Sequence, residues 1–152
     1  MASKRRAKAT SQVLMHSSWR TPAVPWAIRL YLTETGRNDF SKWNASLSTK
    51  GRARRDSNIK FLRFQPEERW RRPEAAALGN HASVIHFQDE TTFQHRLFGY
   101  FDLENHAFVI CVVGFEQGNK YHPKDYEQRI QQRRASVGDA FNKRTIPCPW
   151  PV

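Results

Sequence analysis

The sequence predicts an α+β domain: a small antiparallel sheet of about four strands, packed against an N-terminal helical hairpin and followed by a C-terminal helix. Three observations lead to this fold. Residues 82–88 and 92–101 alternate apolar and polar side chains on either side of the polar turn DETT, as in a β-hairpin. Residues 107–115, AFVICVVGF, carry no charge and predict a buried central strand. Apolar residues at helical spacing lie before and after these strands.

A first strand is expected within residues 25–35, ending at Gly36. Its side chains Trp26, Ile28 and Leu30 share one parity and predict a buried face.

The helical hairpin is expected next. Asn38 or Asp39 caps a first helix, which Gly51 interrupts. A second helix follows at about residues 53–64 and ends before Pro66.

Residues 66–80 are interpreted as a connector that Trp70 and Leu78 anchor to the core. After the central strand, residues 123–136 predict the last helix. We expect all helices on one face of the sheet, which leaves the other face partly open.

Charge points to an anionic partner. The chain has 152 residues, with 25 Lys and Arg against 14 Asp and Glu, and a net charge of +11. Nucleic acid, an acidic protein or a membrane surface would each suit this excess. Residues 81–119 alone are acidic, with one base and five acids. Basic segments on both sides of an acidic, strand-like centre favour an anion-binding surface.

Three parts of the chain differ in composition. Residues 1–22 are interpreted as a flexible basic extension, residues 23–138 as the folded domain and residues 139–152 as a proline-rich, irregular tail. The start lacks the apolar core of a secretory signal, and no apolar run is long enough to cross a membrane. Cys111 and Cys148 do not form a disulfide framework, so we expect a cytoplasmic protein.

Five motifs occur in an informative order. They are FSKWNASL, WRRPEAAALGN, FQHRLFGYF, HAFVICVVGF and YHPKDYEQRIQQRR. Over residues 24–135 this order resembles the RelE/ParE toxin superfamily, in particular its HigB-like and phage Gp49-like members.

The resemblance implies the toxin of a type II toxin–antitoxin system, a ribosome-dependent mRNA endonuclease. A ribose 2′-hydroxyl would attack the adjacent phosphate without a metal or another cofactor. The implied partners are a small antitoxin, the ribosome and mRNA, with no membrane. Two alternatives stay open: a noncatalytic toxin of the same fold that inhibits DNA gyrase, and a basic nucleic-acid-binding module without activity.

Arg96 is the first candidate for a catalytic residue. It matches the family's strand arginine, and a guanidinium stabilises the negative charge that gathers on phosphate oxygens in the transition state. The alternative is a structural arginine, exposed at an edge or paired with Asp89 or Glu90.

Three further residues are catalytic candidates. His122, in KYHPKDY, can transfer a proton near neutral pH, unless it is only a surface histidine before a proline. Lys120 supplies charge. His86 can share the face of Arg96, whereas His95 has the opposite parity and is expected to face the helices.

Seven residues are expected to bind RNA by charge or by stacking. They are Lys50, Arg52, Arg54, Arg55, Lys60, Tyr121 and Arg129. Two features depart from the family's pattern. Glu116 and Gln117 stand where many relatives carry a basic pair, and His86 stands where many carry an arginine.

Overall fold

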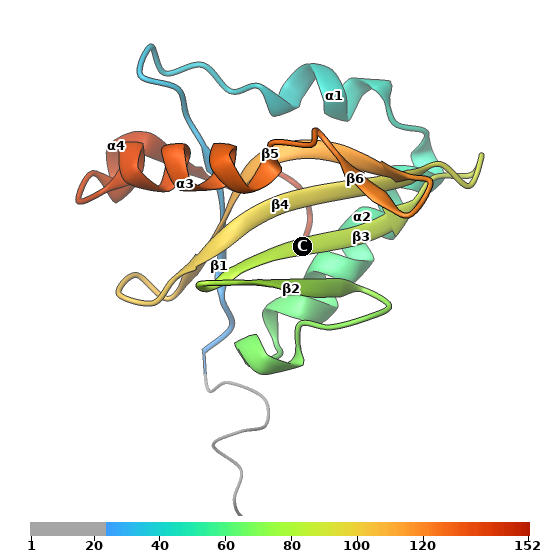
Figure 1. The fold of residues 1–152 in the computed structure, drawn as a ribbon, viewed down its shortest axis with the longest axis horizontal. Helices are drawn as coiled ribbons and strands as arrows, with labels where there is room; N and C mark the ends of the chain where they lie inside the picture. Colours follow the sequence, from blue (N-terminus) through green and yellow to red (C-terminus); the bar gives the residue numbers. More distant parts are fainter. Residues whose placement is uncertain (1–23) are drawn as a thin grey trace, which may run out of the picture.

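A mixed sheet of seven strands organises residues 24–152, which are the residues that this computed structural model describes (Figure 1). The predicted flexible extension, residues 1–22, lies outside the described residues. The strands are β1 (Ala27–Tyr31), β2 (Ala75–Gly79), β3 (Ala82–Gln88), β4 (Gln94–Asp102), β5 (Ala107–Gln117), β6 (Lys120–His122) and β7 (Thr145–Pro147). The helices are α1 (Phe40–Ser46), α2 (Thr49–Arg63), α3 (Tyr126–Val137) and α4 (Phe141–Arg144), with a 3-10 turn, η2, at Glu67–Arg69.

The prediction of a small antiparallel sheet of four strands is wrong. The strand order is β2-β3-β4-β5-β1-β7, and β6 pairs with the far end of β5. The sheet is mixed because β1 runs parallel to β5. Strand β2 lies in the predicted connector, and β7 lies in the tail that we expected to be irregular.

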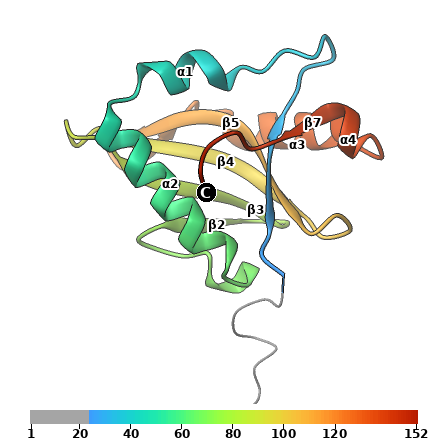
Figure 2. The same ribbon diagram turned by 180° about the vertical axis from the view of Figure 1, so that it is seen from behind.

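The predicted helical hairpin is also wrong. Figure 2 shows that α2 crosses the sheet, whereas α1 lies above β5 and diverges from α2. Gly51 does not interrupt a helix. The Ser48 hydroxyl accepts a hydrogen bond from the Gly51 amide at 3.0 Å, so Gly51 lies in the first turn of α2, where its low helix propensity matters least.

Helices cover both faces of the sheet, so the expected single helical face is a further correction. On the first face, Ile59 and Leu62 of α2 join a core with Leu97 of β4. On the second face, Ile130 and Val137 of α3 join a separate cluster of buried side chains. The second face includes Val84, Phe98, Tyr100 and the fully buried Cys111.

The C-terminal residues complete the first core. Trp150 is buried beside Trp43, with ring centroids 5.8 Å apart. The Arg55 guanidinium lies 3.8 Å from the Trp150 ring centre, and its Nε donates to Asp56 at 2.9 Å. Arg63 donates to the Val152 carbonyl at 2.9 Å. The tail is therefore part of the packed structure, and Arg55, only 1% exposed, lies inside it.

No helix within residues 24–152 combines the length and the apolar character needed to span a membrane.

Candidate functional site

A cleft of about 680 Å³ opens at the free end of β3. Strand β2 pairs with β3 only between Ala82 and Ile85, so the last residues of β3 lack that neighbour. Helix α2, the residues before β2, and the adjoining ends of β4 and β5 supply the other walls. The charged and imidazole side chains that line the cleft are Arg54, Arg72, His86, Arg96 and Glu116.

Arg96 and His86 are directly opposite each other on neighbouring antiparallel strands. Their side chains therefore lie on the same face of the sheet, as the sequence predicted. The opposite orientation of His95 is also confirmed, because its ring stacks on Phe87, with centroids 4.9 Å apart, in the first face.

Arg96 is held by an extensive set of contacts. Its Nη2 lies 2.8 Å from Glu116 Oε1, and its Nε donates to the same oxygen at 3.0 Å. The guanidinium also donates to the His95 carbonyl at 2.8 Å and to Gln94 Oε1 at 3.0 Å. The residue is 5% exposed. Arg96 thus pairs with Glu116, and neither Asp89 nor Glu90 is its partner.

His86 is an uncharged base at neutral pH. Burial, followed by the positive charges of Arg96 and Arg72, lowers its pKa to about 4, although Glu116 acts in the opposite direction. The His86 Nε2 atom lies 3.2 Å from the Tyr121 hydroxyl, within hydrogen-bonding distance. The tautomer of the ring decides which of the two groups donates in this hydrogen bond.

Arg72 is an exposed cation of the cleft. Its side chain has no hydrogen-bond or ion-pair partner among residues 24–152, yet its charge acts on both His86 and Tyr121. Arg54, also exposed, donates to the carbonyls of Gln88 and Asp89 at 3.4 and 3.1 Å. Three guanidiniums and one carboxylate therefore face this space, which gives it excess positive charge.

The structure separates His122 from Arg96. Glu116 is opposite Tyr121 on β6, whereas Phe115 is opposite His122, so the side chains of the two pairs lie on different faces of the sheet. The His122 ring stacks on Phe115 with centroids 4.8 Å apart. Lys120 is exposed at the start of β6, next to Asn119 of the cleft wall. Of the predicted catalytic residues, Arg96 and His86 come together with Tyr121, and His122 does not.

The predicted RNA-binding residues do not form one surface. Lys50 and Lys60 are exposed on α2, on the first face. Arg129 is exposed on α3, on the second face, and pairs with a neighbouring aspartate at 3.0 Å. Arg52 donates to two backbone carbonyls at the end of α1.

Sequence reasoning missed Arg72 and the pairing of Glu116. Arg72 is one of three arginines in the segment RWRR, and nothing in that segment distinguishes it from Arg71. Its place in the cleft depends on where β2 stops pairing with β3, and that point is known only from the three-dimensional structure. In the sequence, Glu116 is recognisable only as an acidic residue where many relatives of the resembled family carry a basic one. The alternation of side chains along β4 and β5 nevertheless permits its contact with Arg96.

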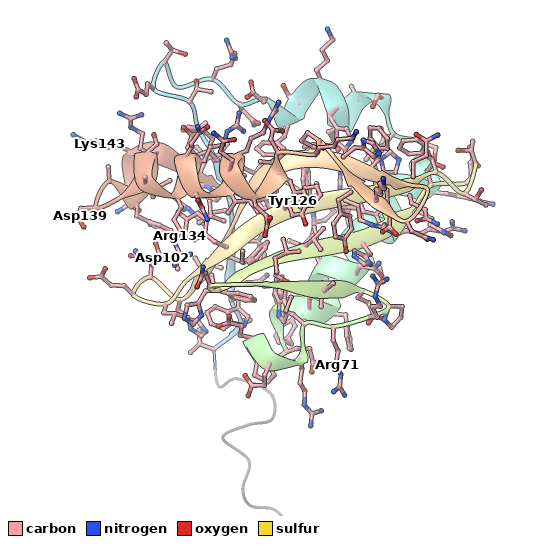
Figure 3. The ribbon with its side chains drawn as sticks, in the orientation of Figure 1. Arg71, Asp102, Tyr126, Arg134, Asp139 and Lys143 are labelled. Atoms are coloured by element: carbon pink, nitrogen blue, oxygen red, sulfur yellow. The ribbon has the colours of Figure 1, made fainter. Side chains whose placement is uncertain are left out.

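A larger hollow of about 900 Å³ lies between the β4–β5 turn and the connection from α3 to α4. Its charged lining residues are Glu104, Asp139 and Lys143, which are exposed and have no ion-pair partner among residues 24–152. Figure 3 shows Asp139 and Lys143 at the periphery of the molecule. Because it has no buried ionisable side chain, this hollow is a weaker candidate than the cleft.

Comparisons with protein-family models, with curated proteins and with solved structures give no significant match to this chain. Within residues 24–152, no cluster of three or more His, Cys, Asp and Glu side chains is arranged to hold a metal ion.

Proposed function

We propose that this chain is the toxin of a type II toxin–antitoxin system, an endoribonuclease that cuts mRNA in the ribosome with the scissile phosphate bound in the cleft. The main support for the proposal is that an uncharged, buried His86 lines the same cleft as the guanidiniums of Arg72 and Arg96. A proton acceptor beside fixed positive charge is what attack by a ribose 2′-hydroxyl requires.

Arg72 and Arg96 have different roles in this proposal. Arg72, which has no ion-pair partner within residues 24–152, binds a nonbridging oxygen of the incoming phosphate. Arg96 is already fixed by Glu116, so its charge is oriented before the substrate arrives. Preorganised charge of this kind stabilises the transition state without reorganisation during the reaction.

Proton transfer is assigned to His86 together with Tyr121. The 2′-oxygen forms a bond to phosphorus as its proton passes to this pair. The bond from phosphorus to the 5′-oxygen breaks, and the pair returns a proton to the departing oxygen. The products are a 2′,3′-cyclic phosphate and a 5′-hydroxyl, and every step uses side chains of this protein.

The partners in this proposal are those that the resemblance implies, and the charge of the cleft suits them. The ribosome presents the mRNA, which places the reaction in the cytoplasm. An antitoxin covers the cleft with an acidic segment, because Arg54 and Arg72 are exposed there. Charge reversal at Arg72 should weaken that complex.

The experiment is induced expression in cells, with primer extension on abundant transcripts. Arg72→Ala is the test variant, since Arg72 is exposed and its loss removes no hydrogen bond or ion pair within residues 24–152. Arg71→Ala is the matched control, because it removes the same charge from a side chain that points away from the sheet (Figure 3). We expect discrete cuts within translated regions for the unmodified chain and for Arg71→Ala, and far fewer for Arg72→Ala.

Other results would favour the alternatives. Growth arrest with intact transcripts and with DNA damage would support gyrase inhibition. Intact transcripts with normal growth would support a nucleic-acid-binding module without activity. Equal cutting by both arginine variants would show that the phosphate binds elsewhere.

A further inference from the structure

We propose that a second hollow beside the cleft binds one base of single-stranded RNA. This hollow, of about 320 Å³, lies between the β3–β4 turn and the β5–β6 turn. We call it the tip pocket and define it by Phe93, Gln94, Gln117 and Asn119, which line it together with Glu116. The inference rests on the proposed function in one respect, namely that the adjacent cleft holds the phosphate of the same strand.

The tip pocket and the cleft are adjacent and share part of their walls. Gln94, Glu116 and Asn119 line both of them. A nucleotide with its phosphate near Arg72 and Arg96 therefore has its neighbouring base within reach of the tip pocket. This adjacency suits a single strand, whose bases are free to turn away from the backbone.

Phe93 provides a fixed ring for stacking. Its side chain is 44% exposed, although large aromatic residues are usually buried. The ring nevertheless packs against two other rings, because its centroid lies 4.8 Å from that of His95 and 5.5 Å from that of Phe115. An exposed aromatic ring that is held in place stacks a base without losing much side-chain freedom.

The pocket also offers unused hydrogen-bonding groups. The side-chain amides of Gln117 and Asn119 make no hydrogen bond within the described part of the chain, residues 24–152. The side-chain oxygen of Gln94 accepts a hydrogen bond from Arg96, and the side-chain amino group of Gln94 remains available. Amides donate and accept at neighbouring atoms, so they match the edge of a base. A ring for stacking beside free amides favours a base over a peptide side chain as the occupant.

The test measures equilibrium binding of a fluorescein-labelled, single-stranded 2′-O-methyl RNA decamer to the full chain. This probe has no free 2′-hydroxyl, so binding is measured without cleavage. Phe93→Ala should weaken binding about 10-fold, because stacking of one base is lost. Phe93→Trp should retain it. Phe61→Ala is the matched control, since Phe61 is 51% exposed on α2, and it should bind as the unmodified chain does.

A second probe tests the base itself. A decamer in which every nucleotide is abasic should bind the unmodified chain and Phe93→Ala equally, because only the phosphates remain. The slope of affinity against salt concentration should be the same for both proteins, since Phe93 contacts no phosphate.

Several results would overturn the tip pocket: no binding by the unmodified chain, equal binding by Phe93→Ala, or an equal loss in Phe61→Ala. The outcomes also separate the two proposals. Binding that depends on Phe93 without any mRNA cleavage supports the tip pocket and contradicts the nuclease. Cleavage that Phe93→Ala leaves unchanged in rate and position supports the nuclease and overturns the tip pocket.

Discussion

His86 links the candidate site to stability. Its pKa is about 4 in the folded chain and 6.5 in an unfolded one, so the unfolded chain binds more protons between these values. The contribution of His86 to the free energy of unfolding should therefore be constant above pH 6.5. It should fall as the pH drops from 6.5 towards 4, by at most about 3 kcal/mol. Urea unfolding at pH 7 and pH 4.5 measures the loss. His86→Gln should lose less stability over this interval than the unmodified chain, and an identical loss would contradict the assigned pKa.

Arg96 and Glu116 form a buried ion pair, and removal of one partner leaves the other charge without compensation. Their side chains are 6% and 14% exposed. Arg96→Ala should lower the free energy of unfolding by about 3 kcal/mol. The double variant Arg96→Met with Glu116→Leu should recover most of that stability while remaining inactive. Chemical denaturation with a cleavage assay separates the two effects, and a stable Arg96→Ala variant would mean that the pair is exposed in solution.

At the scale of elements, the C-terminal residues are predicted to be essential. Trp150 is 7% exposed and packs on Trp43 and on the buried guanidinium of Arg55. Trp150→Ala should cost about 3 kcal/mol, since it opens a cavity and uncovers a buried charge. Phe64→Ala is the control, because Phe64 is 41% exposed and its removal should change thermal stability little. Equal melting temperatures for the two variants would show that the tail does not contribute to the core.

The sequence predicted the longer elements well and the short ones poorly. Strands β3, β4 and β5 alternate or are wholly apolar over seven or more residues, so their patterns are distinct. Strands β6 and β7 have three residues each, and β2 is mostly alanine, so none of them carries a pattern. The parallel pairing of β1 with β5 was missed because it joins segments far apart in the chain, and local periodicity contains no information on such contacts.

At the scale of the whole molecule, net charge predicted a basic site but not its location. Exposed basic side chains lie on both faces of the described structure, and Arg55 and Arg96 are used inside it. Parity was sufficient to place His86 and Arg96 on one face. It did not show that β2 stops short of the end of β3, and that end is where Arg72 enters the cleft.

The central claim is that the cleft promotes attack by a 2′-hydroxyl. The most direct measurement incubates the purified chain with ribosomes translating an mRNA that carries one 2′-deoxynucleotide immediately 5′ of a mapped cut. We predict that the unmodified mRNA is cut to a 2′,3′-cyclic phosphate and a 5′-hydroxyl, that the single substitution abolishes this cut, and that Arg72→Ala slows it while Arg71→Ala does not. Cleavage that persists at the 2′-deoxynucleotide, or no cleavage of either mRNA, would contradict the account.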